Sequence, residues 1–264
     1  MIELLISAVN KNPAELLELM NVKTDAVLVN QCDREDDYFI SRDTKKVHVI
    51  CNNLRGVGRS RNLCIENSKA DIIVFSDEDI RYRDNYEAVI EKAFMEKKDA
   101  DMLLFNVEVC ENRRTYWNDR VKRINYLNFG PYPAYSIAVK REALIKNKIR
   151  YSLLFGGGAK YSNGEDSLFL KDALKNKLRI YAVTAVIGRE EERESTWFKG
   201  YTEKFFYDRG VLFCFLYGKL SVFFILRFII VKKEMFKGKI KRLKALSLML
   251  KGYRRGYTEK SKLA

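Results

Sequence analysis

The segment Ile72-Ile73-Val74-Phe75-Ser76-Asp77-Glu78-Asp79 joins an apolar run to three consecutive carboxylates. Four β-branched or aromatic residues in a row predict a buried strand, so the triplet is expected where that strand leaves its sheet. In open α/β sheets, ligands bind at this edge. Because three adjacent negative charges repel one another, the triplet indicates either a site shared with a divalent cation or substrate hydroxyl, or a solvated acidic turn.

Strand-like and helix-like segments alternate on both sides of this segment. Asn12 and Pro13 supply an N-cap and a first helical residue. The predicted strands cover residues 26–29, 47–51, 72–75, 102–109, 136–139 and 180–186, and the further predicted helices cover 59–68, 85–97, 141–148 and 166–177. Such alternation requires crossover connections, and it predicts an α/β fold with a mostly parallel central sheet flanked by helices.

The composition indicates a globular intracellular protein. The 264 residues are 47% hydrophobic, which is enough for a sizeable core. The five cysteines include no C-x-x-C pair, so the pattern fits neither a disulfide framework nor a zinc site, and a reducing cytoplasm is expected. The N-terminal segment Met1–Ile6 reads as a first strand rather than an export signal.

The positive charge is concentrated at the C-terminal end. Residues 211–264 contain fourteen Lys or Arg against two Glu, whereas residues 1–210 are close to neutral. Two apolar runs, 211–217 and 220–226, are interrupted by Lys219 and Arg227, which disfavours a simple transmembrane helix. This asymmetry indicates an attached element that binds a surface.

A basic amphipathic helix is predicted in the same region. Its apolar positions recur at spacings of three or four: Phe236, Ile240, Leu243, Leu246, Leu250 and Tyr253. Its other positions are basic: Lys237, Lys239, Lys241, Arg242, Lys244 and Lys251. Such a helix suits the headgroup region of an anionic membrane. The alternatives are a helix packed on the body with a solvated basic face and, with less weight, nucleic-acid binding.

Three other clusters accompany the acidic triplet. The loop Asn53–Asn62 combines two glycines with three arginines at the start of a helix, which suits either phosphate binding or a plain glycine cap with exposed cations. Gly156-Gly157-Gly158 precedes Gly164-Glu165-Asp166, whose carboxylates either act chemically or simply cap a helix. The acidic run Glu190–Trp197 alone reads as a solvated turn.

Taken together and in this order, these motifs resemble the family 2 glycosyltransferases, inverting enzymes with the GT-A fold. The resemblance rests on Asn53–Asn62, the strand into Asp77-Glu78-Asp79, the segment 136–144 and Gly164-Glu165-Asp166. It implies a Rossmann-like GT-A catalytic domain at residues 1–207. Residues 208–264 are then an apolar and basic helical extension that associates with a membrane.

The resemblance also implies roles for individual residues. Asp79 would hold Mn²⁺ or Mg²⁺, Asp77 would contact the ribose or the metal shell, and Glu78, the middle of the D-x-D motif, would be replaceable. Asp166, beside Glu165, would be the catalytic base. The residues expected to bind the nucleotide-sugar are Ser7, Val9, Asn30, Asp33, Asn53, Arg61, Ser76, Asp77 and Glu78. The residues expected to bind the acceptor are Gly157, Gly158, Trp117 and Tyr132, with Tyr116 and Tyr135 as further aromatic candidates.

Two departures from the family pattern concern the metal and the base. The sole histidine, His48, precedes the triplet, whereas relatives often carry a late histidine ligand. Either the loop Glu190–Glu194 substitutes for it, or the metal keeps a water there. The first strand ends in Ser7-Ala8-Val9-Asn10 without an aromatic residue, so the resemblance does not identify the nucleotide base.

The sequence therefore predicts an inverting, metal-dependent transferase at the cytoplasmic face of the membrane, peripherally bound. It would move a sugar from a UDP-sugar to a lipid-linked saccharide in surface polysaccharide assembly, with no nucleic-acid partner. One alternative is a nucleotidyltransferase of sugar phosphates, which shares an α/β sheet, arginines and metal-binding aspartates. The other is a non-enzymatic protein that binds nucleic acid or membranes through its basic tail.

Overall fold

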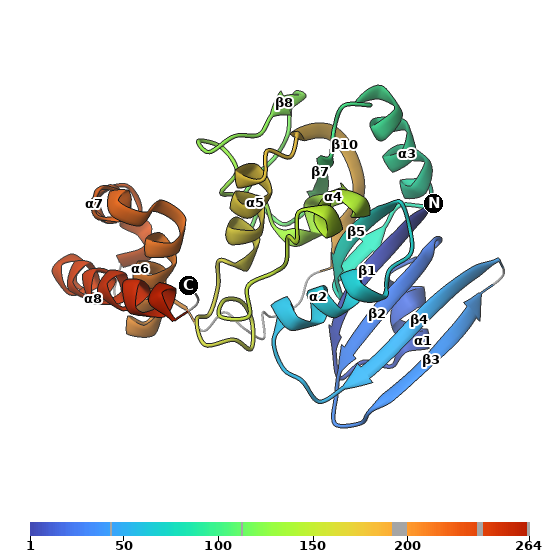
Figure 1. The fold of residues 1–264 in the computed structure, drawn as a ribbon, viewed down its shortest axis with the longest axis horizontal. Coiled ribbons are helices and arrows are strands. Elements are labelled where there is room, and N and C mark those ends of the chain that lie inside the picture. Colours follow the sequence, from blue (N-terminus) through green and yellow to red (C-terminus); the bar gives the residue numbers. More distant parts are fainter. Residues whose placement is uncertain (43, 112, 192–199, 237–239, 263–264) are drawn as a thin grey trace.

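The computed structural model describes residues 1–42, 44–111, 113–191, 200–236 and 240–262, and a single sheet with helices on both faces forms its body (Figure 1). The strands are β1 (Ile2–Val9), β2 (Asp25–Gln31), β3 (Asp36–Arg42), β4 (Lys45–Asn52), β5 (Ile72–Asp77), β6 (Ile80–Tyr82), β7 (Met102–Glu108), β8 (Lys122–Arg123), β9 (Ile137–Lys140) and β10 (Ile180–Glu190). The helices of the body are α1 (Pro13–Leu19), α2 (Val57–Asn67), α3 (Tyr86–Glu96), α4 (Arg141–Lys146) and α5 (Glu165–Lys175).

The sheet is mixed and mostly parallel at its centre, which confirms the predicted fold class. Its strand order is β3-β4-β2-β1-β5-β9-β7-β10-β6, and β8 pairs with β10. β4, β2, β1 and β5 run parallel, as do β7 and β10, while β9 lies antiparallel between β5 and β7. Ser7 pairs with Asp77 and Val9 with Gln31, so the carboxyl ends of β1, β2 and β5 meet at one edge.

The central strands are apolar along their whole length because both faces of the sheet are covered. Leu4 and Ile6 of β1 belong to the core layer formed with α1 and α3, whereas Leu5 belongs to the layer formed with α2, α4 and α5. Successive side chains of a strand point to opposite faces, so each layer takes alternate residues. This burial holds the polar residues at the strand ends in place.

Three helices follow the body: α6 (Glu203–Tyr217), α7 (Ser221–Val231) and α8 (Arg242–Ser261), which pack together beside it (Figure 1). By length and composition alone, the segment Glu203–Val231 is apolar enough to cross a membrane. In the structure this segment bends after α6 at Gly218, whose φ of +56° suits a glycine. The result is two packed helices rather than one straight rod.

α8 differs from the predicted amphipathic helix. It begins at Arg242, after a short 3-10 helix at Lys233–Phe236, and Lys237 and Lys239 lie outside the described residues. Its most buried positions include Ala245, Met249, Gly252 and Gly256, whereas Leu243 of the predicted stripe is 82% exposed. Small residues face inward because α6 crosses α8 so closely that a Cβ at Gly252 would overlap the Tyr207 carbonyl oxygen. Leu243 is therefore not packed against the body, and the membrane contact expected for the apolar face of this helix stays a prediction.

α8 is also tied to the glycine-rich loop of the body. The buried Glu259 carboxylate accepts a hydrogen bond from Lys160 Nζ at 2.8 Å and pairs with Arg255 at 2.6 Å. Lys160 and then Arg255 lower the pKa of Glu259 to about 2. The predicted boundary between residues 207 and 208 falls inside α6, whose Val211 and Leu212 share a core layer with the sheet.

Candidate active site

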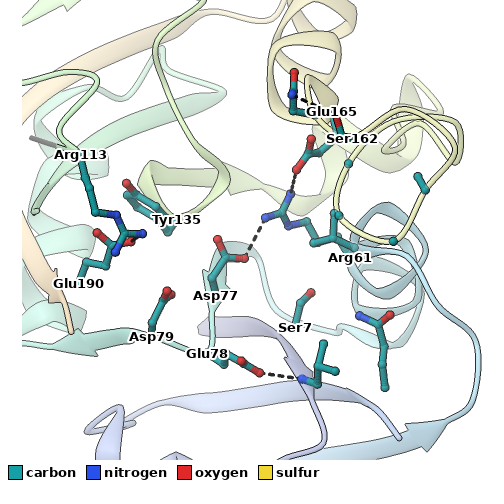
Figure 2. Close-up of a pocket in the computed structure, with 18 of the residues that line it drawn as sticks. Ser7, Arg61, Asp77, Glu78, Asp79, Arg113, Tyr135, Ser162, Glu165 and Glu190 are labelled. Carbon is teal, nitrogen blue, oxygen red and sulfur yellow. Dashed lines mark hydrogen bonds and ion pairs between the residues drawn. The ribbon is translucent and has the colours of Figure 1, made fainter. Parts of the chain in front are cut away.

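A cavity of about 720 Å³ lies at the carboxyl edge of β1, β2 and β5 (Figure 2). The acidic triplet lines it because β5 ends at Asp77 and the chain turns at once into β6. The predicted site residues that line the cavity are Ser7, Val9, Arg61, Asp77, Glu78, Asp79, Gly157, Gly158 and Glu165. Their roles remain predictions, but the fold brings them to one place.

Arg61 is the centre of the charge arrangement. Its side chain is 3% exposed, and its guanidinium donates to Asp77 Oδ1 and Asp166 Oδ1, each at 2.8 Å (Figure 2 shows the Asp77 bond). Glu165 Oε1 lies 3.5 Å away. A desolvated cation is costly unless anions pair with it. Arg61 therefore joins the first residue of the acidic triplet to Asp166, which lies 105 residues after Arg61 in the sequence.

Burial makes Asp166 an unusual carboxylic acid. Desolvation raises its pKa to about 7; the negative charges of Glu165 and Asp77 act in the same direction, and Arg61 opposes them. The Asp166 side chain is 23% exposed and bound to Arg61; it is not among the lining residues, whereas its neighbour Glu165 is. Both follow Gly164, where a Cβ would overlap the side chain of Leu212 in α6. The start of α5 is thus held between α2 and α6.

Glu78 is more constrained than the sequence suggests. Its carboxylate accepts a hydrogen bond from the Val9 N–H at 2.7 Å and lies 3.8 Å from Lys11 Nζ. Its side chain is only 9% exposed. This contact holds the end of β1 against the triplet, so Glu78 has a structural role that the expectation of a replaceable carboxylate did not include; the expectation itself stays a prediction.

The opposite wall is formed by Asp79, Glu190, Arg113 and Tyr135 (Figure 2). Arg113 pairs with Glu190 at 2.7 Å, and the Glu191 N–H donates to the Asp79 carbonyl oxygen at 2.8 Å. The end of β10 is thereby fastened to the triplet. Arg113 carries no sequence signal beyond a charge in a loop, and its placement was missed.

The carboxylates of Asp77 and Asp79 are hard oxygen donors, and both face the cavity (Figure 2). Such donors suit Mg²⁺ or Mn²⁺, which commonly keep waters and substrate phosphates as their other ligands. Among the described residues, no three His, Cys, Asp or Glu side chains converge on one point. His48 stacks on Phe39 and bonds to Asp37 away from this edge, and Glu192–Glu194 lie outside the described residues. The donor set therefore fits a metal bound jointly with a ligand.

Several residues expected to bind the nucleotide-sugar do not line the cavity. Asn30 is buried and makes two hydrogen bonds with the main chain of Lys11, so it shapes the loop after β1. Asp33 is exposed and pairs with Arg55 at 2.8 Å. Asn53 is exposed, and Ser76 is buried with its hydroxyl donating to the Asp77 carbonyl oxygen.

Two of the predicted acceptor residues are likewise absent from the lining. Tyr132 is buried and its hydroxyl donates to Asn118 Oδ1, so it belongs to the core. Trp117 is 42% exposed outside the cavity. Tyr135, in the 3-10 turn at Ala134–Ser136, lines the cavity instead.

The loop before α2 is a structural support rather than an open phosphate cradle. Its Gly56 N–H donates to Gln31 Oε1 at 2.8 Å, and the Val57 N–H donates to the Gly157 carbonyl oxygen at 2.9 Å. A Cβ at Gly156 would lie 2.7 Å from Val57 Cγ1. The helix start and the glycine loop therefore fit against each other, and the N–H groups of Gly56 and Val57 are not free to bind an anion.

The start of α6 forms another part of the cavity wall. Gly200, Thr202, Lys204 and Phe205 line it. Thr202 caps α6 by accepting from the Phe205 N–H at 3.3 Å, and Lys204 pairs with the buried Asp208. This contribution was missed because the segment reads simply as the end of the catalytic body. The first turn of α6 thus takes part in the site.

The fold is similar to that of solved structures of S. aureus TarS. S. aureus TarS 1-349 has a TM-score of 0.62 and 16% sequence identity, over 96% of this chain and 81% of that chain. Its structures in complex with UDP and with UDP-GlcNAc have TM-scores of 0.56 and 0.55, with 14% and 16% identity, over 97% and 98% of this chain and 72% and 73% of those chains. These matches show a shared fold. No curated protein matches the sequence.

The family comparison covers the part of the chain that builds the cavity. The model of glycosyl transferase family 2 matches residues 11–175, which is more than half of the chain and includes Arg61, the acidic triplet and Asp166. The chain therefore belongs to glycosyl transferase family 2.

Proposed function

We propose that this glycosyltransferase moves a sugar from a UDP-sugar to a hydroxyl of a lipid-linked saccharide, with inversion, during assembly of a surface polysaccharide. One observation carries the mechanism: Arg61 binds Asp77 and Asp166 at 2.8 Å each. This bridge sets the donor-side carboxylate and the expected base around one cation at the cavity. The UDP and UDP-GlcNAc complexes of S. aureus TarS support a nucleotide-sugar donor of this type.

On the donor side, Ser7, Val9 and Gln31 lie at the ends of β1 and β2 and would contact the nucleotide. Asp79 and Asp77 would hold Mn²⁺ or Mg²⁺, which, when bound, neutralises charge that develops on the departing diphosphate. Glu78 would keep β1 and the triplet in register through its bond to Val9. Tyr135 and the Arg113–Glu190 pair would close the far side of the sugar site.

On the acceptor side, Asp166 would remove the proton from the attacking hydroxyl. Its pKa of about 7 leaves a large deprotonated fraction near neutral pH while keeping the carboxylate a useful base. Arg61 would hold this carboxylate in one orientation. A single displacement by the activated oxygen, on the face opposite the leaving diphosphate, inverts the anomeric centre.

The lipid-linked acceptor is proposed from the character of the C-terminal helices. Residues 211–264 carry fourteen basic and two acidic side chains. The apolar residues that α7 exposes are Val222, Phe223, Leu226, Ile230 and Val231. A basic element with an exposed apolar face suits peripheral binding to the anionic cytoplasmic face of a membrane.

The test combines donor binding with two carboxylate variants. Thermal stabilisation and hydrolysis are measured for a panel of nucleotide-sugars, with Mn²⁺ and with a chelator. We expect Asp79→Asn to lose metal-dependent stabilisation, and Asp166→Asn to keep it while turnover falls about 10²-fold to 10⁴-fold. Asp119→Asn makes the same chemical change at an exposed position and should behave as wild type.

Two outcomes would contradict the proposal. If no nucleotide-sugar stabilised the protein with either metal, the donor class would be wrong. If Asp166→Asn kept full activity while Asp79→Asn lost it, inverting transfer through this base would be wrong, and nucleotidyl transfer would become the better explanation.

A further inference from the structure

Arg209 of α6 is a second basic side chain in an apolar setting, and it differs sharply from Arg61. Its guanidinium lies 5.1 Å from the ring centroid of Phe205 and 6.0 Å from that of Phe228 in α7. Among the described residues it has no carboxylate partner, and its Nε is buried without a hydrogen bond. Burial lowers the pKa of Arg209, whereas surrounding carboxylates raise that of Arg61. A desolvated cation without an anion is costly, so the site favours an anionic ligand.

The position of Arg209 links the cavity to the outer helices. Phe205, one turn earlier in α6, lines the cavity together with Thr202 and Lys204. On its other side Arg209 reaches Phe228 of α7. In Figure 1, α6 and α7 lie next to each other at the side of the body. An anion held at Arg209 would therefore lie between the catalytic cavity and the exposed helix α7.

α7 exposes apolar side chains from one end to the other. Phe223, Ile230 and Val231 are 63%, 64% and 54% exposed. Val231 lies three residues after Phe228, so this surface extends to the side of α7 whose ring contacts Arg209. Exposed apolar residues gathered on one helix mark a contact surface rather than ordinary solvated surface. The net charge of the surrounding segment, fourteen basic against two acidic residues, favours an anionic amphiphile over a neutral one.

We propose that Arg209 and the exposed face of α7 together bind a membrane lipid phosphate, the guanidinium holding the phosphate and α7 the hydrocarbon chain. A guanidinium binds phosphate oxygens in a bidentate manner, and a hydrocarbon chain gains free energy for each buried methylene. The acceptor role of this lipid rests on the proposed function. It would present its saccharide from α7 toward the wall formed by Thr202, Lys204 and Phe205.

Calorimetry on the full chain measures the binding of decyl phosphate below its critical micelle concentration. Inorganic phosphate, which has only the anion, and decyl maltoside, which has only the hydrocarbon chain, serve as comparison ligands. Wild type should bind decyl phosphate at least about tenfold more tightly than either comparison ligand. Arg209→Gln should weaken decyl phosphate binding about tenfold, since a hydrogen bond to a charged group is lost. Arg254→Gln removes the same charge from an exposed position of α8 and should change it by less than about twofold.

A second variant keeps the test decisive if Arg209→Gln does not fold. Phe223→Ser alters an exposed residue, so it should leave the fold intact while weakening decyl phosphate and not inorganic phosphate. Unchanged decyl phosphate binding by Arg209→Gln, or an equal loss in Arg254→Gln, would overturn the proposal. Equal affinity for inorganic phosphate and decyl phosphate would reduce the site to a free anion site and overturn its lipid assignment.

Stabilisation by a UDP-sugar, measured on the same samples, reports the proposed function separately. If wild type binds decyl phosphate through Arg209 but is not stabilised by any UDP-sugar, the proposed donor is wrong and the lipid site is supported. The reverse pattern would refute the lipid site and leave the transferase mechanism standing.

Discussion

Replacing Arg61 with glutamine removes the cation that three carboxylates share. The size of the effect follows from burial rather than from distance. Arg61 is 3% exposed and binds Asp77 and Asp166 at 2.8 Å, and breaking a buried pair of this kind costs about 3–5 kcal/mol. Arg83 binds Glu108 at the same 2.8 Å, but both side chains are about half exposed, so Arg83→Gln should cost less than about 1 kcal/mol.

The cost of Arg61→Gln should also depend on pH. Arg61 lowers the pKa of Asp166, so its removal lets that pKa rise further above about 7. At pH 5 the carboxyl is protonated and neutral in both proteins. At pH 8 wild-type Asp166 has released its proton to pair with Arg61, whereas the variant must either keep the proton or hold an unpaired charge, and both cost stability. We expect the loss of stability to be clearly larger at pH 8 than at pH 5.

Urea denaturation of wild type, Arg61→Gln and Arg83→Gln at both pH values, in the presence of a chelator, measures these differences. The reasoning is refuted if Arg61→Gln costs no more than Arg83→Gln at pH 8, or if its cost is the same at both pH values. Glycosyl transfer by Arg61→Gln should be lost even where the protein remains folded, because Asp166 no longer has a fixed orientation.

Two further predictions concern packing and protonation. Gly210→Ala places a Cβ against the Met249 carbonyl oxygen in α8 and should lower the free energy of unfolding, measured by urea denaturation, by about 1–3 kcal/mol. Gly130→Ala, whose Cβ meets open space, should be nearly neutral. Equal losses in the two variants would contradict the tight crossing of α6 and α8. The raised pKa of Asp166 stabilises the fold below about pH 4, and this stabilisation is lost as pH rises through about 7. The stability of metal-free wild type relative to Asp166→Asn should therefore fall by up to about 4 kcal/mol between pH 4 and pH 8, and parallel pH profiles would show that the pKa is not raised.

The elements of the sheet core were predictable because their signals are local. The apolar runs that became β1, β2, β4, β5 and β7 are buried on both faces, so hydrophobicity alone identifies them. β3, β6 and β8 were missed. β3 lies at the sheet edge with exposed positions, and β6 and β8 have only three and two residues, so each is defined by pairing with a partner strand.

The site was predictable to the level of its motifs but not of its contacts. The acidic triplet, Arg61 and Asp166 each stand out in the sequence. That Arg61 bridges the other two depends on how α2 and α5 pack on the same face of the sheet. Asn30 and Ser76 have the polarity of ligand-binding residues, yet main-chain groups next to them take up their hydrogen bonds.

The C-terminal segment shows the same division. Its charge and apolar content are properties of composition, and they indicate a surface-binding element without any coordinates. Because α6 and α8 pack closely, the glycines and Ala245 of α8 face inward, and the exposed apolar surface lies on α7. The spacing of apolar residues in α8 could not predict this arrangement.

The sequence by itself thus determined the fold class, the family motifs and the location of the charge, because burial, strand alternation and helix capping act over a few residues. Only the tertiary structure decided which carboxylates share Arg61, why Glu78 is constrained, and that α6 contributes to the cavity wall. These depend on contacts between residues that are tens to hundreds of positions apart, where packing geometry rather than residue type selects the partner.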